Sequence, residues 1–367
     1  MDNQVLHTRY QRQIALRGFG EEAQQKLSEA RVLVVAAGGL GCPVLQYLCA
    51  AGVGTIGVVD DDVVSLSNLH RQVLYKTEDV GKPKAIIAAE YLRLLNPQVT
   101  INVYNERLTV ANALDILKQY DIIIDGSDNF ATRYLVNDAC VLLNKPLVYG
   151  AILQYEGRLS VFNIANNKGL RAVNYRDIFA RMPATDVPDC SNAGVLGVLP
   201  GVIGTMMATE VIKLITGIGD VLQGAMMIYN LLSQQMYKVY ISPDPEAEKY
   251  IPETEEEFKR NTYKDVCAAT DLEIGREAFN QWLGKEDVML VDVRAFGEEP
   301  VITEFEYIQI PFNEIENNVH RLIKDNIVLF CASGKRSLAA ARQLKQIDSA
   351  INIYSLKGGI VNWKRSV

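Results

Sequence analysis

Short runs of β-branched residues alternate with helical patterns between residues 31 and 151, and this alternation constrains the fold more than any other feature of the chain. Such alternation is typical of βαβ units, in which a helix connects two parallel strands. One helical pattern begins at Pro83 and stops before Asn96-Pro97, in keeping with the backbone preferences of proline. We therefore predict an α/β, Rossmann-like domain built on a parallel sheet. Its strands are expected at residues 32–35, 55–59, 99–104, 121–124 and 147–149.

The rest of the chain divides into three regions. Strand-like stretches at 158–163 and 225–241 flank an apolar helical pattern at 195–215, so the first domain is expected to span residues 1–241. Residues 242–268 contain three prolines, the acidic run 255–257 and few large apolar side chains, which is typical of a solvated, flexible linker. Residues 269–367 predict a second, small α/β domain. Its strands are expected at 288–293, 307–310, 327–330 and 352–355.

The bulk composition excludes some classes of function. A net charge of -7 with only 22% charged residues provides no basic field for a nucleic-acid backbone, so no nucleic-acid partner is expected. The polar N-terminus lacks the apolar core of a signal peptide, and no uninterrupted apolar run reaches the roughly 18 residues of a spanning helix. We expect a cytoplasmic protein that does not enter a membrane. The six cysteines are irregularly spaced, which fits reduced thiols better than disulfides.

A glycine-rich loop, Ala36-Ala37-Gly38-Gly39-Leu40-Gly41, follows the first predicted strand and precedes a helix. Glycines in this position let backbone N–H groups approach a phosphate at the positive end of the helix. Asp60 ends the next predicted strand, where a carboxylate can accept a hydrogen bond from a ribose hydroxyl. The pattern indicates a nucleotide site. A nicotinamide dehydrogenase and a tight turn without a ligand both remain open on these residues alone.

Three further polar segments separate these hypotheses. They are Ser67-Asn68-Leu69-His70-Arg71-Gln72, Val80-Gly81-Lys82-Pro83-Lys84 and Asp125-Gly126-Ser127-Asp128-Asn129. Attack of a carboxylate on the α-phosphate of ATP gathers negative charge, which Arg, Lys and a carboxylate-bound metal ion can stabilise. A dehydrogenase needs no such cluster. Each segment alone also fits a polar turn, a solvated helix residue or a helix N-cap, but their occurrence together indicates an adenylating enzyme.

Residues 9–241 resemble the ubiquitin-activating-enzyme superfamily, in particular the bacterial MoeB/ThiF/HesA adenylyltransferases. The resemblance rests on Arg9-Tyr10-Gln11-Arg12-Gln13, the glycine loop, the three polar segments and Gly194-Val195-Leu196-Gly197. It implies that the substrate is the C-terminal Gly-Gly of a ubiquitin-like sulfur-carrier protein of the MoaD/ThiS type, and that the protein is a homodimer in which Arg12 reaches the partner's ATP. From the residues alone, Arg12 fits a surface position equally well. The implied ligands are Gly39, Gly41, Asn68, Arg71, Gln72 and Lys84 for the ATP phosphates, Asp60 for the ribose and Asp128 for Mg²⁺ at the reaction centre.

Two features depart from the pattern of that family. Many MoeB-like proteins bind a structural zinc ion with two Cys-x-x-Cys pairs. Residues 170–179 contain no cysteine here, and the second region offers only Cys267, so no zinc site is expected. Ala36 replaces the first glycine of the usual loop, but Gly38, Gly39 and Gly41 keep the positions of close approach. The ATP site is therefore expected to be retained.

The cysteines of this first region differ in their sequence context. Cys42, Cys49 and Cys140 lie in apolar helical patterns and are expected in the core, where cysteine behaves as a small hydrophobic residue. Cys190 lies in a polar loop before a helix, at the position of a cysteine that some family members bond covalently to the carrier. A catalytic thiol and an inert loop thiol are both consistent with this context.

Cys331 carries the strongest thiol signal. It follows an apolar strand and opens Cys331-Ala332-Ser333-Gly334-Lys335-Arg336-Ser337, which leads into a helix. A thiolate at a helix N-terminus near two basic residues is expected to have a lowered pKa and to be able to carry a persulfide. Residues 272–367 resemble a rhodanese domain with a Cys-x-x-Gly-x-Arg active-site loop. Residues 298–310 depart from the usual rhodanese pattern, and a phosphate-binding or inactive rhodanese fold is the alternative.

The two resemblances on one chain narrow the predicted function. An adenylating domain makes a carboxylate electrophilic, and a persulfide domain supplies a sulfur nucleophile, so together they predict thiocarboxylate formation on the carrier from a persulfide sulfur donor. A pathway such as molybdopterin or thiamin synthesis would use this product. Two alternatives remain open: adenylation of another peptide or tRNA-linked carboxylate with the second domain as a docking module, and a nucleotide sensor.

Overall fold

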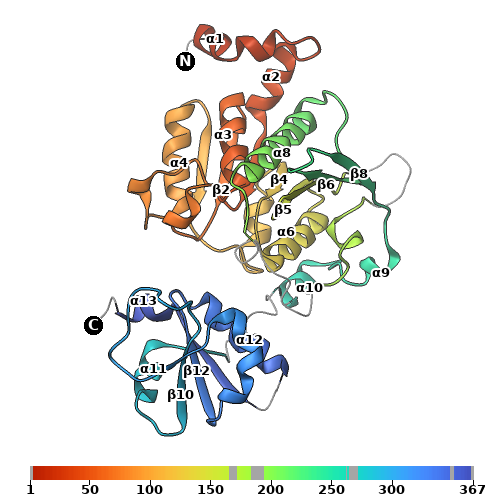
Figure 1. The fold of residues 1–367 in the computed structure, drawn as a ribbon. Helices are drawn as coiled ribbons and strands as arrows, with labels where there is room; N and C mark the ends of the chain where they lie inside the picture. Colours follow the sequence, from red (N-terminus) through yellow and green to blue (C-terminus); the bar gives the residue numbers. More distant parts are fainter. Residues whose placement is uncertain are drawn as a thin grey trace. The chain divides into compact units, whose positions relative to one another are not determined.

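Alternating apolar strands and amphipathic helices build two separate sheets in the computed structural model, which describes residues 3–164, 172–182, 194–261, 263, 272–347 and 351–364. The chain divides into two units, Met1–Asp265 and Val266–Val367, and each unit has its own sheet (Figure 1).

The sheet of the first unit has eight strands in the order β3-β2-β1-β4-β5-β6-β7-β8. Strands β1 to β5 are parallel, and β6, β7 and β8 continue the sheet in antiparallel pairs. Because β1 has β2 on one side and β4 on the other, the winding of the chain reverses there, and loops at the carboxyl ends diverge to leave a crevice. The strands are β1 Arg31–Val35, β2 Thr55–Val59, β3 Thr100–Tyr104, β4 Ile122–Asp125, β5 Leu147–Leu153, β6 Glu156–Phe162, β7 Ala225–Asn230 and β8 Met236–Tyr240.

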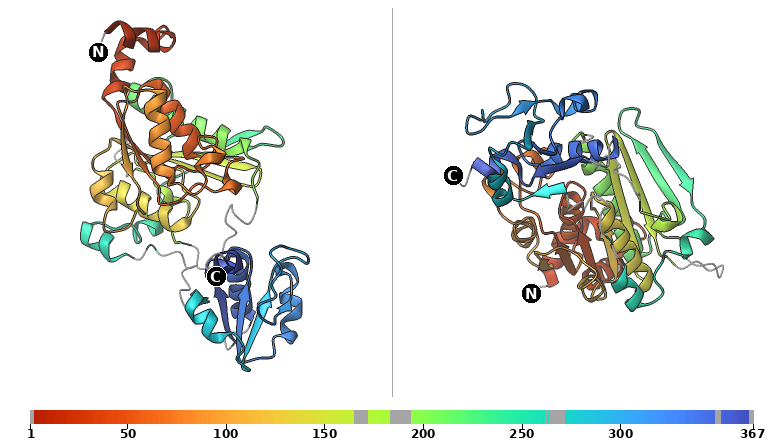
Figure 2. Two further views of the ribbon diagram at one scale, coloured as in Figure 1. Left: turned by 90° about the vertical axis from the view of Figure 1, so that its left-hand side faces the viewer. Right: turned by 90° about the horizontal axis from the view of Figure 1, so that it is seen from below.

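Helices cover both faces of this sheet (Figures 1 and 2). Alternate residues of β1 point to opposite faces: Val32 and Val34 join the core beneath α3, α4 and α8, whereas Leu33 and Val35 join the core beneath α5 and α6. Helix α2 packs on α8, and α1 packs on α2. The helices are α1 Asn3–Ile14, α2 Gly20–Glu29, α3 Gly41–Ala51, α4 Lys84–Leu95, α5 Ala113–Leu117, α6 Phe130–Leu142 and α8 Val198–Thr216, with short 3-10 turns η1 Leu66–Asn68, η2 Thr77–Asp79 and η3 Tyr175–Asp177.

Helix α8 forms over the apolar helical pattern that the sequence analysis places at 195–215. It is long and apolar enough to cross a membrane, and it is the one helix of this kind within the part of the chain that the structure describes. Leu199, Ile203 and Met207 are fully buried in the core that α8 shares with α3 and the strands. A core helix buried against a sheet needs the same apolar composition as a spanning helix, so this packing accounts for the residues of α8.

The segment after β8 differs from its prediction. Residues expected in a solvated linker form α9 Pro245–Glu248 and α10 Glu255–Arg260, and Phe258 is fully buried in the core beneath α6. Thr254 caps α10 by accepting a hydrogen bond from the Glu257 amide. The glutamates of the acidic run occupy the first turn of α10, where the helix dipole favours negative charge. The acidic run is exposed, as a solvated segment predicts, but the stretch is helical and attached to the first unit through Phe258. The domain boundaries themselves stay a prediction.

The second unit is a five-stranded parallel sheet in the order β11-β10-β12-β13-β9. Its two faces are covered by α12 on one side and by α11 and α13 on the other. The strands are β9 Glu273–Ile274, β10 Val288–Asp292, β11 Ile308–Gln309, β12 Asn326–Phe330 and β13 Asn352–Leu356. The helices are α11 Arg276–Trp282, α12 Lys335–Ile347 and α13 Gly359–Lys364, with 3-10 segments η5 Phe312–Glu314 and η6 Glu316–Arg321. The predicted α/β class, with one larger and one smaller sheet, is confirmed.

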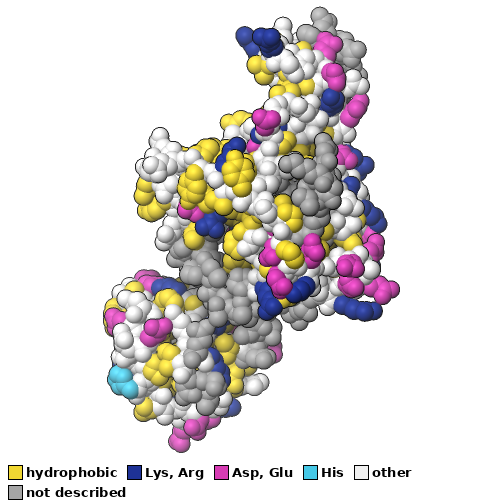
Figure 3. All heavy atoms as spheres, turned by 90° about the vertical axis from the view of Figure 1, so that its right-hand side faces the viewer, with side chains coloured by type: hydrophobic (Ala, Val, Ile, Leu, Met, Phe, Trp, Pro, Cys, Tyr) yellow, Lys and Arg dark blue, Asp and Glu magenta, His cyan; other side chains and the backbone are white. Residues whose placement is uncertain are grey.

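Surface charge of both signs is mixed on the face that Figure 3 shows, where Lys and Arg side chains are interspersed with Asp and Glu. A binding surface for a nucleic-acid backbone gathers basic side chains into a patch or stripe. This face carries no such arrangement among the side chains that the figure colours.

Candidate active site

The glycine loop connects β1 to α3 in a conformation that its sequence only partly indicates. Ala36 has a φ of 73°, which lies in the left-handed region that glycine adopts more easily, at a cost of roughly 1–2 kcal/mol for an L-residue. A Cβ at Gly41 would lie 2.0 Å from the carbonyl oxygen of Ala36, so this position has no room for a side chain. The loop therefore keeps the backbone path of a phosphate-binding turn although its first glycine is alanine.

Asp60 ties the end of β2 to this loop. One carboxylate oxygen accepts a hydrogen bond from the Ala37 amide at 2.7 Å, and the other accepts from the Asp62 amide at 2.8 Å. Burial raises the pKa of Asp60, while Lys84 and the two amides oppose that rise. Each oxygen retains a further acceptor site, so the carboxylate that shapes the loop is also able to accept from a ribose hydroxyl, as the sequence predicts.

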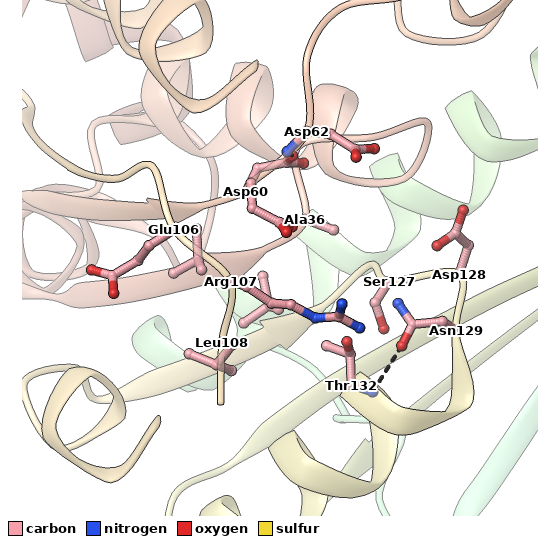
Figure 4. Close-up of a pocket in the computed structure, with 13 residues that line it drawn as sticks. Ala36, Asp60, Asp62, Glu106, Arg107, Leu108, Ser127, Asp128, Asn129 and Thr132 are labelled. Carbon is pink, nitrogen blue, oxygen red and sulfur yellow. Dashed lines mark hydrogen bonds between the residues drawn. The ribbon is translucent and has the colours of Figure 1, made fainter. Parts of the chain in front are cut away.

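A cavity of about 240 Å³ lies at the carboxyl ends of β1, β2 and β4 (Figure 4). Val35, Val59 and Leu108 give it apolar walls, and Arg107 points into it from the loop after β3 toward Ser127 and Asn129. The Asn129 side chain also accepts from the Thr132 amide and caps α6. The full lining is Val35, Ala36, Val59, Asp60, Asp61, Asp62, Glu106, Arg107, Leu108, Ser127, Asp128, Asn129 and Thr132. Apolar walls beside a ribose-binding carboxylate suit a nucleoside.

A second cavity continues from the first along the glycine loop. Its lining brings together Gly38, Gly39, Arg71, Gln72, Lys84, Asp128 and Arg133, which come from five separate segments of the chain. Lys84 is buried and donates to Asp62 at 2.8 Å, and Arg71 donates to the Ser67 carbonyl at 3.1 Å. Cations beside glycine-loop amides suit a polyphosphate.

Gln72 gives this second cavity an unsatisfied polar group. The side chain is only 4% exposed, and its Oε1 has no hydrogen-bond partner among the described residues. An orphaned buried oxygen is costly unless a ligand or water supplies a donor. Asn68 and Gly41, by contrast, are not among the residues that line either cavity: Asn68 accepts from the Arg71 and Gln72 amides through its carbonyl, and Gly41 begins α3.

Two carboxylates follow β4 and differ sharply in environment. Asp125 is almost fully buried, accepts from the Ser127 amide at 2.9 Å, and has its pKa raised by that burial. Asp128 is exposed and lines both cavities at the point where they meet. Magnesium sites commonly use one or two carboxylates together with substrate phosphates and waters. The exposed oxygens of Asp128 therefore fit a metal ion bound jointly with a polyphosphate.

Other predicted residues are not brought to these cavities by the described structure. Arg12 is exposed on α1 and lines neither cavity. Cys190 and Cys267 lie outside the described residues. Cys42 and Cys49 are fully buried, as predicted, and burial raises their pKa values to about 12 and about 11. Cys140 is also fully buried, and its pKa is raised for the same reason.

Cys331 lies between the end of β12 and the start of α12, fully buried. Its sulfur accepts from the Ser337 amide at 3.4 Å and from the Ser337 hydroxyl at 3.5 Å, and that hydroxyl shares a 2.8 Å hydrogen bond with Ser355. Gly334 has a φ of 89°, and a Cβ there would lie 2.9 Å from the Gly358 amide nitrogen, so the loop closes tightly around the thiol. This arrangement holds the sulfur among donors that stabilise an anion.

The basic residues of the Cys331 loop are arranged differently from the prediction. Lys335 is exposed, and Arg336 forms a two-pronged ion pair with Glu298, with N–O distances of 2.6 and 2.7 Å. Arg336 is close enough to Cys331 to interact with it electrostatically, as predicted, but its guanidinium is already paired with a carboxylate.

Sequence reasoning missed Arg107, Arg133, Ser337 and Glu298. Arg107 follows the carboxyl end of a parallel strand, where ligands gather in open α/β sheets, and this rule could have identified it. Ser337 stands within the Cys331 loop, but only the distances assign it a contact. Glu298 reaches the loop across 38 residues of sequence, and no local pattern predicts that pairing.

Comparison with known families finds a match for each of the two units. A model of the ThiF family matches residues 10–249, and a model of the rhodanese-like domain matches residues 276–366. The chain belongs to the ThiF family. It also carries a rhodanese-like domain, so both predicted resemblances are confirmed.

Relatives of this ThiF-family protein share one or both domains. A "Sulfur carrier protein adenylyltransferase" of Thermus thermophilus is 52% identical over 238 residues, covering 65% of this chain and 88% of the relative. The "Probable adenylyltransferase/sulfurtransferase MoeZ" of Mycobacterium tuberculosis is 41% identical and covers 98% of this chain and 93% of its own length. The "Adenylyltransferase and sulfurtransferase MOCS3" of Arabidopsis thaliana is 35% identical, and the match covers 98% of this chain and 83% of the relative.

Solved structures resemble the ThiF-family unit at lower identity. PaaA matches with a TM-score of 0.55 and 22% identity, covering 66% of this chain and 76% of its own. Escherichia coli MccB with ATP matches with a TM-score of 0.52 and 22% identity, covering 61% of this chain and 68% of the MccB chain. These likenesses support the fold of the first unit and no more.

Proposed function

We propose that this enzyme uses ATP to adenylate the C-terminal Gly-Gly carboxylate of a MoaD/ThiS-like, ubiquitin-like sulfur-carrier protein, and then transfers sulfur from a Cys331 persulfide to give a thiocarboxylate. The observation that carries the proposal is the presence on one chain of a nucleotide cavity joined to a cation-lined cavity, together with a thiol held among hydrogen-bond donors. The names of full-length relatives, which join adenylyltransferase and sulfurtransferase, support it.

The adenylation step assigns a role to each part of the two cavities. The carrier carboxylate attacks the α-phosphate, and the bond to pyrophosphate breaks with its electron pair going to the leaving group. Arg71 and Lys84, with the amides of the glycine loop, stabilise the negative charge that accumulates. The buried Oε1 of Gln72 accepts a hydrogen bond from a donor group of the bound ligand or from a water. Mg²⁺, bound jointly by Asp128 and the phosphates, would add charge stabilisation at the same centre.

Arg107 supports the nucleoside assignment of the first cavity. Its guanidinium points into that cavity toward Ser127 and Asn129 (Figure 4), and the apolar side chains of Val35, Val59 and Leu108 line the same cavity. A planar cation of this kind can stack on the face of a purine.

The sulfur-transfer step follows from the acyl adenylate. The terminal sulfur of the Cys331 persulfide attacks the carrier carbonyl, and AMP leaves with the electron pair of the mixed anhydride bond. This produces an acyl disulfide that joins the carrier to Cys331. A second thiol must then attack the Cys331 sulfur to release the thiocarboxylate, and we assign this role to Cys190. The resulting Cys331–Cys190 disulfide requires an external thiol to reduce it before the next turnover.

The remaining parts of the proposal concern assembly and surroundings. Arg12 lies on the surface of α1, away from the cavities of its own chain, and we propose that it reaches the ATP of a second copy in a homodimer. We also propose a cytoplasmic location, a protein persulfide as the sulfur donor and the absence of a zinc site. The domain division at residues 1–241, 242–268 and 269–367 is part of the same proposal.

Two assays on the full-length protein test the proposed function. ATP/pyrophosphate exchange should depend on a carrier with an intact C-terminal Gly-Gly, and a carrier that lacks the last glycine should not support it. Mass spectrometry should then detect a gain of sulfur on the carrier when a persulfide donor is added. Exchange without any carrier, or exchange supported equally by the shortened carrier, would contradict the assignment of the substrate.

A further inference from the structure

Glu298 forms an ion pair with Arg336, a residue of the Cys331 loop. Its two carboxylate oxygens accept from the two terminal nitrogens of Arg336 at 2.6 and 2.7 Å, which uses the paired donor edge of that guanidinium. This hydrogen-bonded pairing lowers the pKa of Glu298 to about 2, so the carboxylate is ionised at every working pH. Arg336 is thereby neutralised by a neighbour that belongs to a different loop.

The loop that carries Glu298 is fixed at several points. Arg294 is buried and pairs with Asp292 at 2.7 Å, and it also donates to the Pro300 carbonyl at 3.0 Å. The Ala295 amide donates to the Glu298 carboxylate at 2.9 Å, and Gln309 donates to the Ala295 carbonyl at 3.1 Å. These contacts hold both ends of the turn, so Glu298 is positioned before any substrate arrives.

This pairing affects sulfur donors differently. Thiosulfate carries a doubly charged oxyanion head that cationic donors stabilise, and both terminal nitrogens of Arg336 already donate to Glu298. An alkyl or protein persulfide needs only to bring its terminal sulfur to the thiolate of Cys331. Resting on the proposed sulfur-transfer role of Cys331, we propose that Glu298 is a specificity-determining residue that excludes free oxyanion donors by occupying Arg336.

The two competing reactions differ in the group that leaves. With a persulfide, the Cys331 thiolate attacks the outer sulfur of R–S–SH, a new S–S bond forms, and R–S⁻ leaves with the electron pair of the old one. With thiosulfate, the same thiolate attacks the outer sulfur and sulfite leaves with the electron pair of the broken S–S bond. The difference between the donors therefore lies in the charge of the leaving group, which is sulfite for thiosulfate and a thiolate for a persulfide.

Thiocyanate formation from thiosulfate and cyanide measures this recognition on the full-length chain, and persulfidation of Cys331 by a small alkyl persulfide serves as the reference reaction. Glu298→Gln should raise kcat/KM for thiosulfate about tenfold, mainly through KM, because one repulsive charge is removed and one guanidinium is released. The alkyl persulfide rate should change less than about threefold. Glu299→Gln is the matched control, since Glu299 is exposed and its carboxylate accepts from the Val301 amide and not from Arg336.

Further variants separate charge from folding. Glu298→Asp keeps the charge and should stay close to the wild type with thiosulfate, and Glu298→Gln combined with Arg336→Gln should lose the gain. An unchanged thiosulfate rate in Glu298→Gln, with alkyl persulfide activity retained, would overturn the proposed role of Glu298 and leave the proposed function standing. Equal loss with both donors would also overturn it, because Glu298 would then serve the structure of the loop. Wild-type protein that accepts sulfur from neither donor would overturn the sulfur-transfer step of the proposed function itself, and pyrophosphate exchange would still test the adenylation step.

Discussion

Gly41→Ala tests whether the close approach of the glycine loop underlies adenylation. A Cβ at position 41 would lie 2.0 Å from the Ala36 carbonyl oxygen and 3.0 Å from its carbonyl carbon. Cβ contacts shorter than 3.0 Å are essentially never observed, so the loop must open by at least 3.0 minus 2.0, or about 1 Å. The clashing atom belongs to the backbone, and no side-chain rotation can relieve the contact.

This displacement sets the size of both expected effects. Overpacking of this kind costs about 1–3 kcal/mol of unfolding free energy. A shift of about 1 Å in the amides that face the phosphates should lower the exchange rate by about 10²-fold. Gly201→Ala is the matched control, because Gly201 lies in α8 and a Cβ added there would meet open space, with no neighbouring atom within 4 Å. Alanine at that position should add about 0.5–1 kcal/mol of helix stability.

The assay is carrier-dependent ATP/pyrophosphate exchange, with thermal unfolding of the same preparations. We expect Gly41→Ala to lose exchange and to unfold at a lower temperature than the wild type. Gly201→Ala should keep its exchange activity and unfold at a higher temperature. Exchange within about threefold of the wild type in a Gly41→Ala protein of unchanged stability would refute the argument, since the amides would then not be held by this contact.

Other substitutions test separate parts of the proposal. Asp128→Ala should lower exchange at least about 10²-fold while leaving thermal stability unchanged, because the side chain is exposed. Asp220→Ala is the control, since Asp220 is exposed and lines neither cavity, and near-normal exchange in Asp128→Ala would reject the metal assignment. Cys331→Ala should leave exchange intact and stop thiocarboxylate formation from a persulfide donor; a wild-type rate without added sulfide would remove the rhodanese-like domain from the mechanism. Mixing Arg12→Ala protein with Asp128→Ala protein should restore some exchange if Arg12 acts on the partner's ATP. The control is the same mixture with Arg17→Ala in place of Arg12→Ala. Confirmed mixed dimers that show no exchange would contradict the proposed role of Arg12.

The sequence predicted those features that depend on local pattern. The period of the apolar residues predicted the five parallel strands, and the resemblance to the adenylyltransferases predicted that Asp60 and Asp128 share one site. Both residues line the same crevice. Ala36 shows the limit of motif matching, since the backbone adopts the left-handed turn without the expected glycine. The loop therefore keeps the backbone conformation of the turn although position 36 is alanine and not glycine.

Features set by tertiary contact could not be predicted in this way. Phe258 follows an acidic run that suggests solvent, yet it is fully buried beneath α6 because the chain returns to the first unit there. The pairing of Glu298 with Arg336 joins segments that only the parallel sheet brings together. Neither contact can be recognised from hydrophobic periodicity, because each depends on a single residue that does not recur at helical or strand spacing.

The three buried thiols described in the first unit have a practical consequence for counting sulfur on this protein. Cys42, Cys49 and Cys140 are fully buried with raised pKa values, and thiol reagents attack the thiolate. Brief alkylation of the native protein should therefore spare them, and a second, isotopically distinct reagent added after denaturation should mark all three. Peptides that contain them then serve as internal standards for complete recovery, against which the fraction of Cys331 that carries an extra sulfur atom can be expressed as an absolute occupancy.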